Sequence, residues 1–105
     1  MMKRFVILLG LIFAPMLSFG QNAVVHINAE FNKSNDWYGL ESLEGVKVYN
    51  GYLESNPKMK ERYNITKVPT LILYIDGKET KRWEGGLDMK LHATVSEVQE
   101  QINKH

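Results

Sequence analysis

The chain has 105 residues, with 13 basic side chains, 12 acidic side chains and no cysteine. This length allows one domain with a modest core, and a formal net charge of +1 gives no electrostatic footprint for nucleic acid or an anionic membrane. Without a thiol the domain can form no disulfide and must hold together by packing, and it has no thiolate for disulfide exchange.

The beginning of the chain has the pattern of a secretory signal peptide. Lys3 and Arg4 give a basic start, residues 5–17 form an apolar run, and a small-residue cleavage site precedes Gln21. An apolar run of this length is shorter than the ~20 residues that cross a bilayer as a helix. We therefore expect export without a stable membrane anchor after cleavage.

Cleavage between Gly20 and Gln21 would divide the chain into a signal peptide, residues 1–20, and a single domain, residues 21–105. It would remove two of the 13 basic side chains, which leaves 11 against 12 acidic ones. The mature domain would be secreted or periplasmic. Its charge balance again predicts no nucleic-acid partner.

The first elements after the signal peptide are a strand and a short helix. Residues 23–27 are a β-branched apolar run typical of a buried strand. Residues 36–45 place Trp37, Leu40 and Leu43 at helical spacing, which predicts a helix of about two turns that Gly45 ends. So short a helix would leave apolar sheet surface bare.

A second strand follows over residues 46–53, where apolar and polar side chains alternate. This pattern suits an edge or half-buried strand. Lys47 and Gly51 would discourage further pairing along its outer edge.

The middle of the chain predicts a helix and then a hairpin. Asn56 is a suitable helix cap, with Pro57 at the first helical position. Residues 70–75 are strongly β-prone, and Asp76-Gly77 is a two-residue hairpin signal. Residues 78–83 should therefore return antiparallel.

The last element predicted is an amphipathic helix. Asp88 is expected to cap it, and its apolar side chains recur at steps of four, three and four residues along one face. These side chains are Leu91, Val95, Val98 and Ile102. The pattern as a whole predicts the α/β class.

Two parts of the chain resemble the thioredoxin family. Residues 29–35 read Ala-Glu-Phe-Asn-Lys-Ser-Asn, where the family reads Ala-Glu-Trp-Cys-Gly-Pro-Cys. Residues 63–85 have the family's spacing of a Pro-Thr strand entrance, an Asp-Gly turn and a later glycine. The resemblance implies a minimal thioredoxin-like fold, in the order strand-helix-strand-helix-strand-strand-helix. Its four-stranded mixed sheet would be flanked by three helices, with right-handed crossovers joining the first three strands.

The redox motif of the family is degenerate in this chain. Its positions hold Asn32, Lys33, Ser34 and Asn35, and an asparagine amide is neither ionisable nor nucleophilic near neutral pH. We therefore expect no catalytic residue and no oxidoreductase activity. The polar side chains of this loop would equally serve to cap a helix, and Ser34 has no serine-hydrolase motif around it.

The second family motif is Val68-Pro69-Thr70, where the resemblance implies a cis-proline and a peptide-binding backbone. A cis bond is inexpensive only before proline. A proline at a strand entrance also leaves neighbouring backbone groups free to bind a partner strand. The alternative is that Pro69 only shapes the turn into the strand.

The surface around this motif would form a groove. It would be flanked by Phe31 and Trp37, either of which could instead belong to the core, and by Gly85 and Gly86. His26 lies where the family places a buried acid, and could be a hydrogen-bonded interior histidine. The three histidines show no metal-ligand spacing, so no metal and no cofactor are expected.

The sequence thus predicts an exported, redox-inactive domain that binds a protein or an extended peptide in this groove. A second hypothesis is a homodimer or a subunit of a larger assembly, which would cover the bare sheet. A third is that resemblance to the family implies disulfide reductase or isomerase activity, which the missing cysteines argue against.

Overall fold

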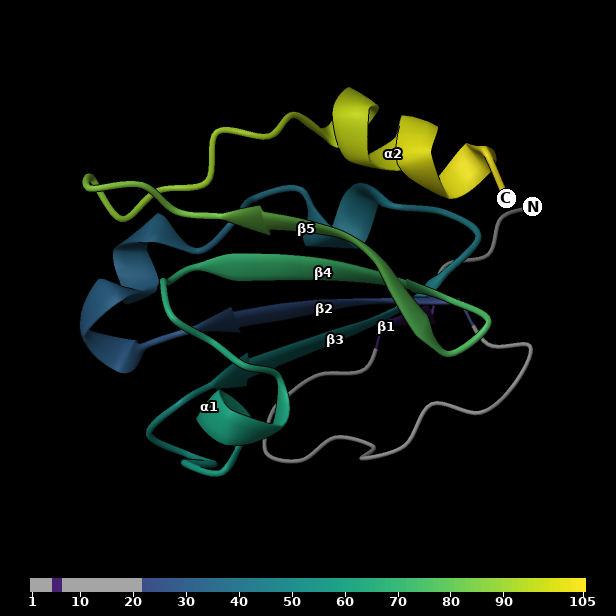
Figure 1. Ribbon diagram of the computed structural model, residues 1–105. Coiled ribbons are helices and arrows are strands. Elements are labelled where there is room, and N and C mark those ends of the chain that lie inside the picture. Colours follow the sequence, from purple (N-terminus) through teal and green to yellow (C-terminus); the bar gives the residue numbers. More distant parts are fainter. Residues whose placement is uncertain (1–4, 7–21) are drawn as a thin grey trace.

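The computed structural model describes residues 5–6 and 22–105, which form a mixed β-sheet with helices on both faces (Figure 1). Apart from residues 5–6, the predicted signal peptide lies outside the described residues. The elements are β1 (Phe5–Val6), β2 (Ala23–Asn28), η1 (Glu30–Asn35), η2 (Leu40–Ser42), β3 (Lys47–Tyr52), α1 (Met59–Arg62), β4 (Thr70–Ile75), β5 (Lys78–Glu84) and α2 (Val95–Asn103).

The strand order is β1-β3-β2-β4-β5, with β2 at the centre. Strand β2 runs parallel to β3, with Val24 opposite Val48, and antiparallel to β4, with Val25 opposite Ile72. A right-handed crossover is predicted between β2 and β3 and between β3 and β4. The second of these predictions is wrong, because β4 runs opposite to β3. The β3–β4 connection begins and ends at the same end of the sheet, so the four-residue helix α1 is long enough for it.

The predicted sheet of β2 to β5 gains the two-residue strand β1 at its edge. Phe5 pairs with Lys47 and Val6 with Val48, in parallel. The expectation that Lys47 would discourage further pairing of β3 is wrong. The exposed Lys47 side chain does not block the ladder, because only the backbone groups of β3 take part in it.

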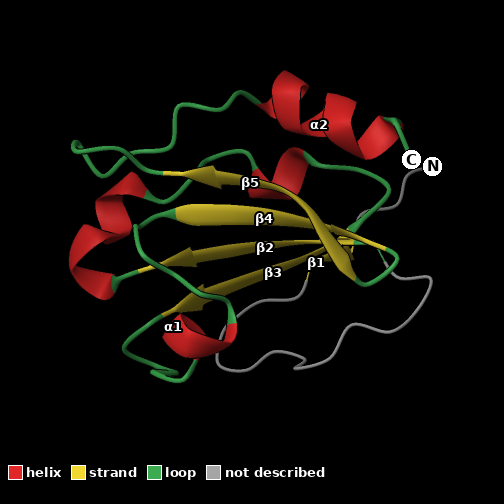
Figure 2. Cartoon of the chain, viewed as in Figure 1, coloured by secondary structure: helices red, strands yellow, loops and turns green. Residues whose placement is uncertain are grey.

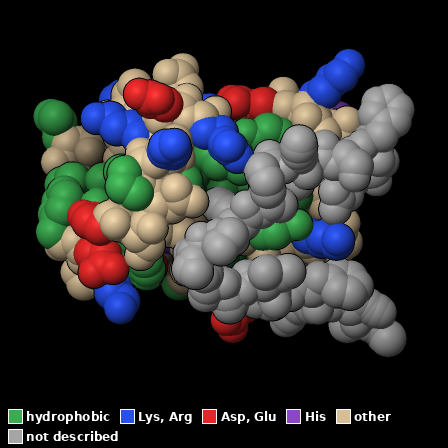
Figure 3. Space-filling view, turned by 90° about the horizontal axis from the view of Figure 1, so that it is seen from below, with side chains coloured by type: hydrophobic (Ala, Val, Ile, Leu, Met, Phe, Trp, Pro, Cys, Tyr) green, Lys and Arg blue, Asp and Glu red, His purple; other side chains and the backbone are tan. Residues whose placement is uncertain are grey.

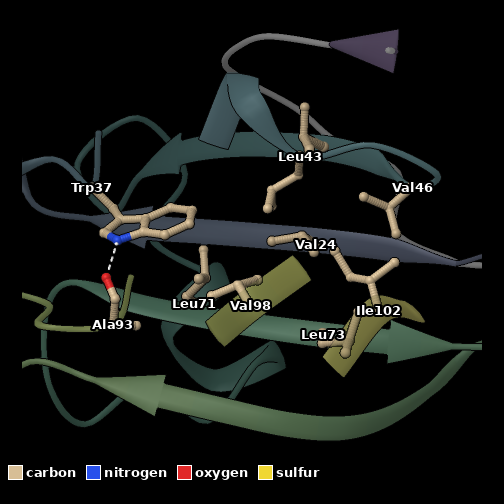
Figure 4. Packing of buried hydrophobic residues seen from close by; sticks show 10 residues of the cluster. Val24, Trp37, Leu43, Val46, Leu71, Leu73, Ala93, Val98 and Ile102 are labelled. Carbon is tan, nitrogen blue, oxygen red and sulfur yellow. Dashed lines mark hydrogen bonds between the residues drawn. The ribbon is translucent and has the colours of Figure 1, made fainter. Parts of the chain in front are cut away.

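Side chains of β2 alternate between two buried clusters, one on each face of the sheet. One cluster packs β2, β3 and β4 against α2 and the chain between η1 and β3 (Figure 4). The other packs them against α1, on the opposite side of the strands (Figure 2). Trp37 and Leu43, at 5% and 1% exposure, lie in the first cluster. The sheet face that we expected to be bare is therefore covered.

The helix predicted over residues 36–45 is absent. This segment contains the three-residue 3-10 turn η2, and η1 ends just before it at Asn35. The reason is tertiary packing. A Cβ atom built on Gly39 would lie 2.5 Å from Val95 and 2.8 Å from the Trp37 ring, so the backbone approaches both closely. The Trp37 indole also donates a hydrogen bond of 2.9 Å to the Ala93 carbonyl (Figure 4).

Helix α2 is shorter than predicted and Asp88 does not cap it. Thr94 is the cap, since its hydroxyl accepts from the Glu97 backbone N–H at 3.1 Å, and the Glu97 carboxylate accepts from the Thr94 N–H at 2.9 Å. This capping box begins the helix six residues after Asp88. Asp88 instead contacts the exposed side chain of His92 at 2.7 Å.

One local prediction is confirmed and one is corrected. Asp76 and Gly77 have φ of 55° and 80°, as a two-residue hairpin turn requires. The Asn56 side chain, however, makes no capping bond to α1, whose Met59 N–H bonds to the Asn56 backbone carbonyl at 3.0 Å.

In the part of the chain that the structure describes, no helix has both the length and the apolar character needed to span a membrane.

Candidate functional site

The two asparagines at the degenerate redox positions are fixed by hydrogen bonds. The Asn32 side chain is 5% exposed, and its amide donates to Asn28 Oδ1 and to the Met89 carbonyl, each at 3.0 Å. Asn35 donates in turn to Asn32 Oδ1 at 2.8 Å. These positions are therefore part of the interior structure of the loop, and they present no reactive group.

The network extends through Asn28, at the end of β2, to the other side of the loop. The fully buried Asn28 amide donates to the Asn32 carbonyl at 2.9 Å and to Asp36 Oδ1 at 2.7 Å. The Tyr52 hydroxyl donates to Asp36 Oδ2. Among the described residues no buried side-chain nitrogen or oxygen lacks a partner, so the network is complete.

Tyr52 serves this network as a donor. Burial and the hydrogen bond to Asp36 raise the pKa of Tyr52 to about 12, so its phenol stays protonated at neutral pH. The Lys33 ammonium lies 5.6 Å from the centroid of the Tyr52 ring, within range of a cation–π contact. Sequence reasoning placed Asp36 at the end of this loop but missed Asn28 and Tyr52 as its partners, because the fold alone brings them together.

His26 is a hydrogen-bonded interior histidine, as the sequence allowed. It is 1% exposed, its Nε2 accepts from the Trp37 backbone N–H at 3.2 Å, and its Nδ1 lies 2.7 Å from Asn50 Oδ1. Because Nε2 accepts, Nδ1 carries the proton and donates to Asn50. Burial lowers the pKa of His26, which favours the neutral ring that this arrangement requires.

The Val68–Pro69 peptide bond is cis, and Gly85 packs directly on it. The Gly85 N–H donates to the Pro69 carbonyl at 2.9 Å. A Cβ atom on Gly85 would lie 2.6 Å from the Val68 carbonyl oxygen, so only glycine fits there. A Cβ atom on Gly86 would fit without strain, since its nearest neighbour would be Asp88 Oδ1 at 3.8 Å. The structure thus brings together the predicted Val68, Pro69, Gly85 and Gly86.

A pocket of about 340 Å³ opens beside these residues. Val68 and Gly86 line it, together with residues that the sequence did not single out: Leu53, Lys60, Ile65, Thr66, Lys67, Leu87 and Met89. Met89 links the pocket to the asparagine network, because its carbonyl accepts from Asn32. The lining residues come from three loops and from helix α1, and no periodic pattern in the sequence relates these segments to one another.

The remaining predicted residues are divided between surface and interior. Phe31 is 74% exposed beside the asparagine loop, and Lys33 and Ser34 are also exposed. Trp37, proposed as a groove residue, lies in the core, and Thr70 is buried at the start of β4. Within residues 5–6 and 22–105, no group of three or more metal-binding side chains lies together.

Comparison with known proteins agrees with this architecture. No family model matches the chain. A thioredoxin of Chlamydia trachomatis is 46% identical over 43 residues, a segment that spans 41% of this chain and 42% of that protein. The relationship at the sequence level is therefore local.

Solved structures match over a larger part of the chain. A thioredoxin of Schistosoma mansoni has a TM-score of 0.61 at 19% identity, covering 81% of this chain and 77% of its own. A thioredoxin variant of Halobacterium salinarum has a TM-score of 0.60 at 16% identity, covering 81% and 74%. Thioredoxin-2 of a malaria parasite has a TM-score of 0.57 at 16% identity, covering 100% and 97%. The chain thus has the thioredoxin fold and a weak homology to thioredoxin, but it has no cysteine.

Proposed function

We propose that this chain is an exported, redox-inactive thioredoxin-like domain that binds a protein or an extended peptide non-covalently beside Pro69. The observation that carries the proposal is the pocket of about 340 Å³ that opens next to Val68. The predicted signal peptide supports export. Binding rather than catalysis follows from the chemistry of the two asparagines.

Disulfide exchange begins with the attack of a thiolate on a disulfide sulfur. The chain has no thiol, and the amides of Asn32 and Asn35 are neutral and hydrogen-bonded. The protein should therefore show no rate above background in an insulin-reduction assay. A measurable rate would defeat this part of the proposal.

The backbone at Val68 supports pairing with an extended segment. Val68 lies two residues before β4 begins, and in the described part of the chain its N–H and C=O have no backbone hydrogen-bond partner. An extended peptide can add to such unpaired groups while a neighbouring pocket receives one of its side chains. The pocket beside Val68 has apolar walls for this purpose.

A titration of ¹⁵N-labelled protein with an uncharged, end-capped hexapeptide containing a central leucine tests the binding site. The amide signals of Val68, Gly86 and Leu87 should shift, while those of the Asp76-Gly77 turn, outside the pocket lining, should stay in place. Shifts confined to the turn, or no shifts at millimolar peptide, would refute the proposed groove.

The second candidate is a homodimer or a subunit of a larger assembly. It no longer rests on a bare sheet, because Trp37 and Leu43 cover that face. Two exposed aromatic side chains still favour it, Phe31 at 74% and Tyr38 at 73% exposure, and neither lines the pocket. Size-exclusion chromatography with light scattering tests this candidate, and a clean monomer removes the homodimer.

A further inference from the structure

The pocket beside Val68 is apolar in its walls and positively charged at its rim. Leu53, Ile65, Leu87 and Met89 supply aliphatic surface. Its volume of about 340 Å³ lies at the lower end of the range of ligand pockets, about 300–1,000 Å³. A space of this size suits one aliphatic side chain and the backbone next to it.

The two charged residues that line the pocket are both lysines. Lys60 and Lys67 are exposed, and no acidic side chain is among the described residues of the lining. Neither ammonium group forms an ion pair with a described residue. Two positive charges thus lie at this pocket, although the protein as a whole is close to neutral.

The backbone holds both lysines at the pocket. The Lys60 carbonyl accepts from the Ile65 N–H at 2.8 Å, and the Lys67 carbonyl accepts from the Thr70 hydroxyl at 2.6 Å. Glu54 is next to Leu53 in the sequence but does not line the pocket, and its carboxylate accepts from the Glu30 N–H at 2.8 Å. Glu54 is therefore engaged away from the positive rim.

The exposed surface continues the apolar lining beyond the pocket. Leu87 is fully exposed. Figure 3 shows hydrophobic side chains gathered at the end of the molecule where η1 lies in Figure 1, with both basic and acidic side chains close by. An apolar pocket whose lining holds two lysines and no acidic side chain is complementary to a partner that carries both an aliphatic side chain and carboxylates.

We propose that the pocket selects an extended acidic peptide, with an aliphatic side chain in the pocket and carboxylates beside Lys60 and Lys67. The inference rests on the proposed function and names the class of its partner. Exposed ion pairs are individually weak and are screened by salt. Two such pairs should favour an acidic peptide over a basic one by roughly tenfold at low ionic strength.

Two end-capped hexapeptides test the inference. Each has a central leucine, followed by two glutamates in one peptide and by two lysines in the other. Titrations of ¹⁵N-labelled protein should give the acidic peptide the lower Kd, by about tenfold in low salt and less at about 0.5 M salt. The shifts should include the amides of Lys60, Lys67 and Leu87.

A charge-reversed variant tests whether Lys60 and Lys67 cause the preference for the acidic peptide. Lys60→Glu with Lys67→Glu should invert the preference between the two peptides. Lys78→Glu with Lys104→Glu changes the net charge equally at two exposed lysines outside the pocket lining, and it should keep the preference. A preference that persists in the first variant would overturn the assignment to these lysines.

The outcomes distinguish a failure of the charge selectivity from a failure of the proposed binding groove. Equal binding of both peptides at Val68 and Leu87 would overturn the charge selectivity and leave the groove intact. If neither these peptides nor the uncharged one bind there, both the groove and its selectivity fail. A preference for the basic peptide would also contradict the inference.

Discussion

The side-chain amide of Asn32 donates a hydrogen bond of 3.0 Å to the backbone carbonyl of Met89, 57 residues further along the chain. Asn32 stands where the resembled family has its first cysteine, and Met89 lines the pocket beside Val68. Met89 has a φ of 59°, a left-handed conformation that is uncommon for a residue other than glycine. Asn32 therefore helps to support the wall of the proposed binding site.

Replacing Asn32 should destabilise the protein. Asn32→Ala leaves the buried Asn28 oxygen and the Met89 carbonyl without this donor, at a cost of about 1–3 kcal/mol in the free energy of unfolding. Asn35→Ala is the matched control, because Asn35 is partly exposed and donates only within the loop, to Asn32 Oδ1. Urea denaturation of the two variants should rank Asn32→Ala as clearly less stable. Equal stabilities would show that the bond to Met89 contributes nothing.

Adjacent glycines offer a comparison at the proposed groove. Gly85→Ala would place a Cβ atom 2.6 Å from the Val68 carbonyl oxygen and 2.9 Å from Pro69 Cδ, so the backbone must shift. We expect a loss of about 1–3 kcal/mol in the free energy of unfolding, together with weaker peptide binding.

Gly86→Ala is the control for this experiment, since the space around Gly86 is open. It should change the free energy of unfolding by no more than about 0.5 kcal/mol. Similar midpoints of thermal unfolding for the two alanine variants would contradict the close packing of Gly85 on the Val68–Pro69 segment.

The cap of α2 gives a local prediction. Thr94→Ala removes the hydroxyl that accepts from the Glu97 N–H, and should cost about 1 kcal/mol in the free energy of unfolding. Asp88→Ala should leave the helical signal in circular dichroism unchanged, because Asp88 lies outside the helix and does not cap it. If instead Asp88→Ala lowers the helical signal and Thr94→Ala does not, the observed helix start is wrong.

Stability should depend on pH through His26. Its pKa is lowered by burial in the folded protein, whereas an unfolded histidine titrates near 6.5. Between these two pKa values the unfolded chain binds more protons, so the stabilisation is fully present above pH 6.5 and is lost as the pH falls toward the folded value. The hydrogen bond to Asn50 and the charge of Asp36 oppose this lowering of the pKa without reversing it.

Urea denaturation between pH 7.5 and about 5 measures this dependence, above the range in which most carboxylates titrate. The slope should persist in His92→Gln, because His92 is exposed. The imidazole NMR signals of His26 should stay in the neutral form as the pH falls through 6.5, the ordinary pKa of a histidine. A His26 ring that becomes protonated at that ordinary value would contradict its buried, hydrogen-bonded state.

Local signals in the sequence predicted those parts of the fold that depend on neighbouring residues. Asp76-Gly77 specifies its hairpin turn by backbone preference alone, and the β-branched run from Ala23 specifies a buried strand. The helix expected over residues 36–45 failed because distant side chains decide that segment. Val95 packs closely against Gly39, and the Trp37 indole bonds to the Ala93 carbonyl, and neither contact is visible in local periodicity.

The site could be predicted only in part for the same reason. Resemblance to a known family pointed to Val68, Pro69 and Gly85, which the fold brings together. The pocket itself needs Lys60 from helix α1 and Leu87 from the loop after β5, which no motif joins to Val68. By contrast, the capping box at Thr94 was available as a Thr-x-x-Glu pattern, so the choice of Asp88 was an error of reading.

Affinity purification from the native exported fraction, with the immobilised protein and two variants as bait, tests the central claim most directly. Leu87→Glu puts an acidic group on the pocket lining, and Tyr38→Glu makes the same change at an exposed site outside it. We expect one partner to be retained by the parent and by Tyr38→Glu, and to be lost with Leu87→Glu. Equal retention by Leu87→Glu would contradict binding beside Val68.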